Sequence, residues 1–360
     1  MNHAPLAWLR RNLFSDVFSG ITTLVLLAGA LYWLPGLIDW LLLTAVFAPD
    51  ANACQAVNHA GACWGVVAEK YRFILFGRYP HGEQWRPLLA TALLLLVIAA
   101  SGLRLLSRGS LLAAWALILP TFLVLMGGGS FGLGAVSSDQ WGGFPLTLLL
   151  ATLGMLLAFP LAILVALSRQ SRLPLLRALC TVYVELVRGV PLISVLFLAS
   201  FLFPIILPPG FSIDVLLRVQ AGIVLFAAAY LSETIRGGLL AVPGGQHAAA
   251  AALGLGPWQS MRWIILPQAL RAVIPSLMNS AVSVFKDTSL VTVVSLYELT
   301  GALSLALAGD AQWRSFYLEG YLFIGAIYWT GCHAMSRFAA RLELGREPAD
   351  RRLDLKMLEQ

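Results

Sequence analysis

The chain has 360 residues, of which 59% are apolar and only 12% are charged, and it carries 24 Lys and Arg against 18 Asp and Glu. Soluble domains are about 45–50% apolar and about 25% charged. The composition therefore excludes a soluble enzyme, a disordered protein and a nucleic-acid-binding domain, and it predicts an all-α integral membrane protein.

Apolar segments predict eight transmembrane helices. A helix that crosses the hydrocarbon core of a bilayer needs about 20 mostly apolar residues. The predicted spans are 17–34, 87–103, 111–126, 144–167, 189–207, 215–231, 273–296 and 316–335. The piece Leu37–Ala48 is short and contains Asp39, so it is predicted to lie at the membrane interface. The apolar run after Arg10 and Arg11 is longer than a typical signal peptide core, which favours an uncleaved first helix.

The distribution of cationic residues predicts the orientation. With both termini inside, sixteen of the 24 Lys and Arg fall on the inner face, six on the outer face, and Arg188 and Lys286 within spans. Short cytoplasmic loops are enriched in Lys and Arg. We therefore expect a multi-pass protein with cytoplasmic termini.

The chain is predicted to have three parts. Residues 1–140 hold three spans, a long outer loop and the stretch Gly127–Gly132, which is typical of a flexible connector. Residues 141–340 hold five spans, and residues 341–360 form a tail. Cys54 and Cys63 lie in the long loop and would form a disulfide in an oxidising compartment, with two free thiols as the alternative. The five histidines are scattered singly, so no metal site is predicted.

Ionisable residues within predicted spans form three clusters. Such residues are costly in a membrane and indicate functional sites. The clusters contain Glu185 and Arg188, then Glu233 and Arg236, and then Lys286, Asp287, Thr288 and Ser289. In the first two, the Arg follows the acid by three residues, a spacing that allows an ion pair within one helix. The alternative is that these groups line a polar pathway between helices.

Lys286 and Asp287 are predicted to lie deep in the seventh span. If that helix enters near Arg271, Lys286 lies about fifteen residues or roughly 22 Å along it. Adjacent residues point in different directions on a helix, so the two need separate partners or a break in the helix. A break at Thr288 and Ser289 is tolerated at this depth where it lines a cavity. This favours a pathway role, above all for Asp287 and Ser289.

The loop between the sixth and seventh spans carries the most specific motif. It is Ala-rich and hence helical, and Gly254 and Pro257 are predicted to end the helix. The loop resembles the signature Gly-Gln-x-Glu-Ala-Ala-x-Ala-Leu-Gly-Leu, followed by Ile-x-Leu-Pro-Gln-Ala-Leu-Arg, of the permease subunits of ABC importers for polar amino acids. The matching residues are Gly245, Gln246, Ala249, Ala250, Ala252, Leu253, Gly254 and Leu255, then Ile264 and Leu266 to Arg271.

Other segments extend the resemblance over residues 141–340. Glu185–Pro191 and Lys286–Leu290 are similar to further elements of that family. The first three spans are more loosely similar to the larger permeases of general L-amino-acid transporters. The resemblance implies a five-helix type I ABC importer permease core preceded by three extra helices. It also implies that Gly245, Gln246, Ala248, Ala249, Ala250, Gly254 and Leu255 form the helix that couples the permease to its ATPase.

The resemblance further implies an assembly in the bacterial inner membrane. Its other members would be a second homologous permease, two ATP-hydrolysing subunits and a periplasmic amino-acid-binding protein. This chain has no Gly-Lys followed by Ser or Thr, so it is expected to be a transport subunit without its own cofactor, while ATP and Mg are used by the partner ATPase. The family's motif glutamate is replaced by Ala248, which puts the strength of coupling in question.

Two other functions are the alternatives to an importer. A secondary amino-acid transporter driven by an ion gradient is expected to have two similar halves with broken helices at matching positions. The two halves here differ in length, charge and glycine pattern. A membrane scaffold without a transport role would leave the three charge clusters without a purpose.

Overall fold

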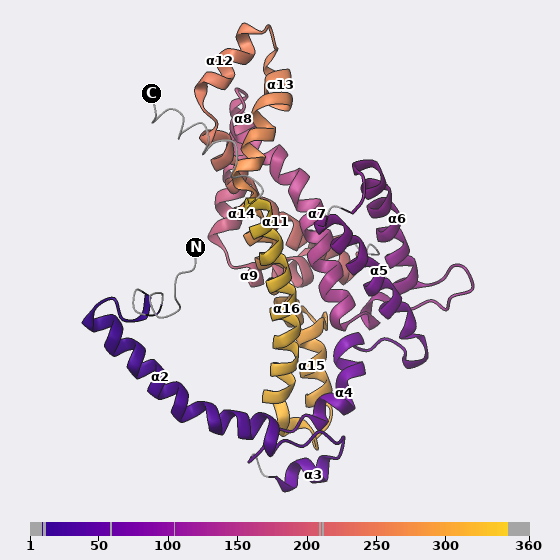
Figure 1. Cartoon of the computed structure of the whole chain (residues 1–360). Helices are drawn as coiled ribbons and strands as arrows, with labels where there is room; N and C mark the ends of the chain where they lie inside the picture. The colour runs from indigo at the N-terminus through magenta and orange to yellow at the C-terminus, as the bar shows by residue number, and fades with distance from the viewer. Residues whose placement is uncertain are drawn as a thin grey trace. The chain divides into compact units, whose positions relative to one another are not determined.

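The computed structural model describes residues 9, 12–57, 60–103, 105–208, 210 and 212–344. Arg10, Arg11 and the tail from residue 345 onward lie outside these residues. The described part of the chain is built from helices and contains no β-strand (Figure 1). It divides into two compact units, Met1–Tyr71 with Asp310–Gly320, and Arg72–Gly309 with Tyr321–Gln360.

The first unit begins with a long apolar helix. Asp16 caps α2 (Val17–Ile38) by accepting a hydrogen bond from the Ser19 backbone N–H at 2.9 Å. The helix continues directly as the π-helical η1 (Asp39–Leu43), so the prediction of a separate interfacial piece at Leu37–Ala48 is wrong. A single acid does not end a helix whose flanking residues are apolar. No residue of α2 is buried within the chain, as expected of a helix surrounded by lipid or by another subunit.

A disulfide-closed loop follows in the same unit. It contains α3 (Ala51–Ala56) and leads into α4 (Gly65–Phe76). Cys54 and Cys63 are bonded in the structure, with their Cα atoms 5.5 Å apart. The Cys63 backbone N–H donates to Glu319 Oε1 at 2.9 Å, and Lys70 pairs with Asp310 at 2.8 Å. The hydrogen bond from Lys70 lowers the pKa of Asp310. These contacts fasten the loop to residues 310–320.

The second unit contains the remaining helices. They are η2 (His81–Glu83), α5 (Trp85–Gly102), α6 (Arg108–Gly127), η3 (Ser138–Gln140), α7 (Gly143–Arg169), α8 (Pro174–Gly189), α9 (Leu192–Phe197), η4 (Leu198–Leu202), α10 (Phe203–Ile206), α11 (Val215–Ala241), α12 (Gly244–Ala252), α13 (Pro257–Ser260), η5 (Met261–Ile265), α14 (Leu266–Asp287), η6 (Thr288–Val294) and α15 (Leu299–Ala308). The helix α16 (Tyr317–Leu344) follows the short η7 (Arg314–Phe316), and most of α16 belongs to this unit.

The core of the second unit lies around α11, which packs against α7, α14 and α8. Small residues bring these helices close together. A Cβ atom on Gly238 would lie 2.6 Å from the carbonyl oxygen of Ala269, so only glycine fits where α11 crosses α14. Close approach of helices at small residues is the usual way in which membrane helices gain packing energy.

The glycine-rich stretch after α6 is a hydrogen-bonded turn and not the predicted flexible connector. Gly128 has a φ of +63°, and a Cβ there would lie 2.0 Å from the carbonyl oxygen of Gly134. The fully buried Arg86 donates from Nε to the Leu125 carbonyl at 2.7 Å and from Nη1 to the Gly134 carbonyl at 2.9 Å. An arginine from α5, the helix that precedes α6, therefore fixes this segment.

The prediction of eight spans is not confirmed. Within the described residues, five helices are long and apolar enough to cross a membrane, and a sixth is added if α8 and α9–α10, bent by 108°, count as one. The predicted span 273–296 is interrupted, because α14 ends at Asp287. The predicted span 215–231 lies within the longer α11, which runs to Ala241, and the predicted span 316–335 begins at the last residue of η7 and continues in α16, which runs to Leu344.

Candidate functional site

The predicted break in the seventh span is present. The α-helical hydrogen bonding of α14 ends at Asp287, and the 3₁₀-helical η6 begins at Thr288. The Thr288 hydroxyl donates to the carbonyl oxygen of Phe285 at 2.8 Å, and Ser295 then takes a left-handed conformation with a φ of +64°. The change from α- to 3₁₀-helical hydrogen bonding places the Asp287 carboxylate where α14 ends.

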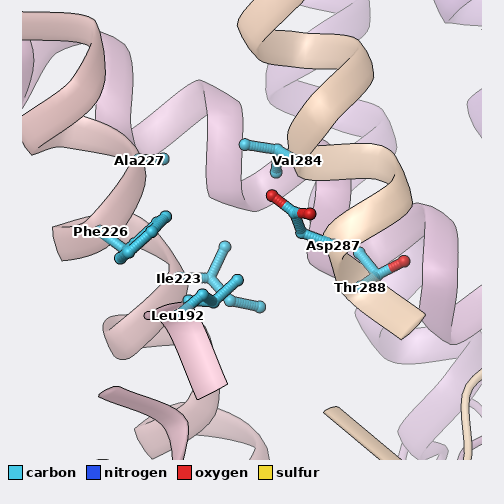
Figure 2. Close-up of a pocket in the computed structure, with 7 residues that line it drawn as sticks. All are labelled: Leu192, Ile223, Phe226, Ala227, Val284, Asp287 and Thr288. Carbon is cyan, nitrogen blue, oxygen red and sulfur yellow. The ribbon is translucent and has the colours of Figure 1, made fainter. Parts of the chain in front are cut away.

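Asp287 borders a small enclosed space between α9, α11 and α14. Figure 2 shows its carboxylate facing this space, with apolar side chains on the other walls. The lining residues are Leu192, Ile223, Phe226, Ala227, Val284, Asp287 and Thr288. The volume is about 10 Å³, which is near the minimum for one water molecule.

A larger, open pocket adjoins the same carboxylate, and we call it the Asp287 pocket. Its volume is about 400 Å³, and it is lined by Phe226, Ala227, Tyr230, Leu231, Asn279, Ser280, Ser283, Val284 and Asp287. No Lys or Arg is among the described residues that line it. One carboxylate with hydroxyl and amide groups, and without a neighbouring cation in the lining, is suited to accept an ammonium group from a polar solute.

The pocket includes polar residues that the sequence analysis missed. Asn279, Ser283 and Asp287 recur at intervals of four residues, which places them on one face of α14. That spacing could have identified them. Of the predicted cluster, Asp287 and Thr288 reach the two pockets, whereas Lys286 is exposed and neither it nor the half-buried Ser289 lines them.

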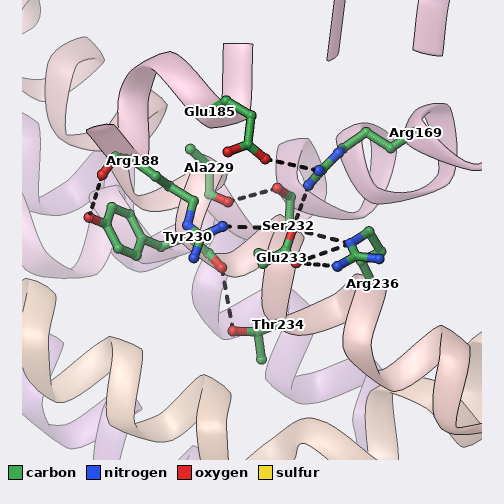
Figure 3. Close-up of polar contacts among 9 residues, drawn as sticks. All are labelled: Arg169, Glu185, Arg188, Ala229, Tyr230, Ser232, Glu233, Thr234 and Arg236. Carbon is green, nitrogen blue, oxygen red and sulfur yellow. Dashed lines mark hydrogen bonds and ion pairs between the residues drawn. The ribbon is translucent and has the colours of Figure 1, made fainter. Parts of the chain in front are cut away.

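The other two predicted charge clusters meet in one place, which we call the Glu233 cluster. It consists of Arg169, Glu185, Arg188, Glu233 and Arg236 (Figure 3). Glu233 Oε2 lies 2.5 Å from Arg169 Nη1 and 3.9 Å from Arg188 Nη1. The carboxylate of Glu233 also pairs with Arg236. Glu185 lies 3.4 Å from Arg169.

This arrangement corrects the predicted pairing in part. Glu233 and Arg236 do pair within one helix. Glu185 and Arg188 instead form ion pairs with other helices, because α8 packs against both α7 and α11. Arg169, at the end of α7, joins both acids and was not predicted as a site residue. Its side chain is only 10% exposed, so its charge depends on these partners.

Tyr230 connects the Glu233 cluster with the Asp287 pocket. The guanidinium carbon of Arg188 lies 5.6 Å from the centre of the Tyr230 ring, and the Tyr230 hydroxyl donates to the Arg188 carbonyl at 3.5 Å. The same ring lines the pocket. Tyr230 is therefore in contact with Arg188 of the Glu233 cluster and with the Asp287 pocket at the same time.

The predicted coupling segment forms a short helix, α12, which ends before Gly254 with its φ of +75°. Pro257 begins the next helix, α13. Gln246 accepts a hydrogen bond from Gln268 Nε2 at 3.3 Å, which fastens α12 to the start of α14. Ala250 is buried. Gly245, Ala248, Ala249 and Gly254 are exposed, and Leu255 is half-buried, so a partner could reach one face of the helix.

Comparisons with known proteins agree with this architecture. Residues 158–346 match the family described as binding-protein-dependent transport system inner membrane component. The inner membrane amino-acid ABC transporter permease protein YhdY of Escherichia coli is 41% identical over 95% of this chain and 94% of its own length. The glutamate/glutamine/aspartate/asparagine transport system permease protein BztC of Rhodobacter capsulatus is 33% identical over 94% of this chain and 93% of its own length.

A solved structure is also similar. The crystal structure of an amino acid ABC transporter with histidines is 27% identical and has a TM-score of 0.50. The similarity covers 56% of this chain and 91% of that one.

Proposed function

The chain belongs to the family of binding-protein-dependent transport system inner membrane components, and on this basis we propose that it forms part of the pathway of an ATP-driven amino-acid importer. It is a multi-pass membrane transport subunit of the ABC importer type. The names of its relatives support amino acids as the substrate class and support an importer over a secondary transporter.

The assembly that we propose contains four kinds of subunit. It contains this chain, a second homologous permease, two copies of an ATPase that uses ATP and Mg, and a periplasmic amino-acid-binding protein. We place both termini and α12 in the cytoplasm, since the excess of Lys and Arg lies on that side. The disulfide-closed loop then faces the periplasm, where disulfides persist.

The Asp287 pocket carries the proposal for the pathway. Its carboxylate accepts the ammonium of the amino acid, and Asn279, Ser280 and Ser283 offer further hydrogen-bonding groups. The lining described here supplies no cation for the substrate carboxylate. We assign that interaction to the second permease.

We propose that the Glu233 cluster acts as the inner gate. It ties α7, α8 and α11 together at the end where Arg169 lies. ATP binding closes the paired ATPases and displaces α12, and the movement reaches α14 through Gln246 and Gln268. Transport requires that the substrate and ATP bind the two states of the permease with different affinities, because a ligand indifferent to the state shifts no equilibrium.

The disulfide offers a direct test of the proposed orientation. In cells, Cys54 and Cys63 should resist a membrane-impermeant maleimide until a reductant is added, whereas Cys180 and Cys332 are free thiols. Replacing both loop cysteines by serine should lower the stability of this loop by about 2–3 kcal/mol. If neither cysteine is labelled after an impermeant reductant is added, the periplasmic assignment is contradicted, and labelling without reductant would instead contradict the disulfide.

Ala248→Glu should strengthen docking to the ATPase. The substitution restores the family's motif charge at an exposed position of α12. A new ion pair or helix-terminus interaction is worth about 0.3–1 kcal/mol, or up to about fivefold in affinity. The measurement is the affinity of the purified permease for its ATPase, with Ala251→Glu, also exposed on α12, as the matched control. Equal affinity of wild type and Ala248→Glu would show that the missing glutamate has no role in docking.

Purification of the tagged chain from its native membrane tests the proposed assembly. We expect an ATPase and a second permease to copurify with it. Recovery of the chain alone, still moving an amino acid into liposomes under an ion gradient, would contradict the proposal in favour of a secondary transporter.

A further inference from the structure

Glu298 is a fully buried acid at the start of α15. Its carboxylate caps that helix, accepting hydrogen bonds from the backbone N–H groups of Thr300 at 2.8 Å and Gly301 at 3.1 Å. Burying a carboxylate costs several kcal/mol unless hydrogen bonds compensate for the lost water. A serine or threonine would cap the helix without burying a carboxylate. Capping alone therefore does not account for a glutamate here.

Three hydroxyl groups from other segments also donate to Glu298. They belong to Thr147 of α7 at 3.1 Å, Thr292 of η6 at 3.3 Å and Tyr328 of α16 at 2.7 Å. Hydrogen bonds to a charged acceptor are stronger than those between neutral groups. The side chain of Glu298 thus links the start of α15 with the nearby η6 and with two segments that are distant in the sequence, α7 and α16.

The packing around Glu298 is tight. A Cβ on Gly301 would lie 2.6 Å from Thr292 Oγ1. Any residue other than glycine at position 301 would therefore push α15 away from η6. Thr147 Oγ1 accepts from the backbone N–H of Leu299 at 3.1 Å, and the backbone N–H of Gly143 donates to Tyr297 at 2.9 Å. Hydrogen bonds therefore join three segments into one block: the first turn of α7, the helix η6 and the start of α15.

This block holds the helix break on both sides. Thr292 lies in η6, which follows Asp287 directly. Tyr328 packs against Phe285 in the last turn of α14, with ring centres 5.4 Å apart. Thr292 and Tyr328 both donate to Glu298. Asp287 is thus located between two segments that one carboxylate holds in place.

We propose that Glu298 is a positioning residue, which fixes the break between α14 and η6 and thereby the direction in which the Asp287 carboxylate faces the pocket. The inference rests on the proposed function, because it assigns Glu298 a role through the pathway residue Asp287. Glu298 itself does not line the pocket.

A double-mutant cycle on the reconstituted complex tests this role. The measured quantity is the number of amino-acid molecules imported per ATP hydrolysed. Tyr328→Phe removes one donor and keeps the ring against Phe285, and we expect it to lower this ratio about threefold or more. In the Asp287→Asn background the same change should have less than about a 1.5-fold effect, because residues that act through one another are not additive. Glu298→Gln, which can still cap α15, should behave in the same way.

Thr330→Val is the matched control. Thr330 lies two residues beyond Tyr328 on α16, and its hydroxyl donates to Ala326 of the same helix at 2.8 Å. It should leave the ratio unchanged. Hydrogen exchange on the purified complex supplies a second readout, in which the amides of residues 288–301 should exchange about tenfold faster in Tyr328→Phe, with α11 unaffected.

Each result decides the inference. An equal fold-change in both backgrounds, an unchanged ratio, or unchanged exchange in residues 288–301 would overturn the positioning role. A wild-type complex that hydrolyses ATP and imports no amino acid would instead contradict the proposed function. Full import by Asp287→Asn would contradict the pathway assignment.

Discussion

Asp287→Asn is expected to reduce amino-acid uptake about 10- to 100-fold while the complex still assembles. Asparagine has nearly the same size and keeps hydrogen-bonding groups, but it has no charge to bind an ammonium. A hydrogen bond to a charged group contributes about 1.5–3 kcal/mol, which sets this range. The effect should be large because the described lining of the pocket offers no second carboxylate. The measurement is ATP-dependent uptake of a labelled amino acid by the reconstituted complex.

Lys286→Gln provides the comparison for this variant. Lys286 is adjacent to Asp287 in the sequence, but its side chain is exposed and lines neither pocket. We expect it to change uptake by less than about twofold, as is usual for substitutions at the surface. Normal uptake by Asp287→Asn, or an equal loss in both variants, would show that Asp287 is structural rather than part of the pathway.

Glu233→Gln should give the second large effect, a loss of the coupling between ATP hydrolysis and transport. Glu233 pairs with Arg169 and Arg236 and lies 3.9 Å from Arg188. Without its charge, the nearly buried Arg169 retains only Glu185 as an acidic partner among the ion pairs described. Removing one partner of a fully buried pair costs about 3–5 kcal/mol. Because Glu233 is 25% exposed, we expect its removal to destabilise the closed gate by about 2 kcal/mol. The gate would then no longer close.

The readout for Glu233→Gln is ATP hydrolysis without substrate, measured beside uptake. Hydrolysis should rise or persist while uptake falls at least about tenfold. Glu185→Gln is the matched control, since that acid is 64% exposed and makes one contact of 3.4 Å with Arg169. It should have little effect, as exposed ion pairs contribute about 0–1 kcal/mol. Tight coupling in Glu233→Gln would rule out a gate at this cluster.

The sequence predicted the features that depend on local pattern. The adjacent charges of Lys286 and Asp287 in an apolar run required separate partners or a break, and the structure has the break. The Ala-rich run before Gly254 predicted α12. The family resemblance, carried by motifs in the second half of the chain, is confirmed by the match over residues 158–346.

Features that depend on contacts between distant segments were not predictable. Arg169 was not predicted as a site residue, because only the packing of α7 against α8 and α11 shows that it joins two acids. Glu298 was missed because its donors come from residues 147, 292 and 328. The count of spans depends on the bend after Gly189, which the length of an apolar run does not reveal.

Uptake by proteoliposomes that contain the purified complex tests the central claim most directly. Vesicles are loaded with ATP or with a non-hydrolysable analogue, and the binding protein and a labelled amino acid are added outside. The amino acid should accumulate in vesicles loaded with ATP and not in those loaded with the analogue. This accumulation should be unchanged when ionophores collapse every ion gradient. Accumulation that needs a gradient and proceeds without ATP hydrolysis would contradict the account.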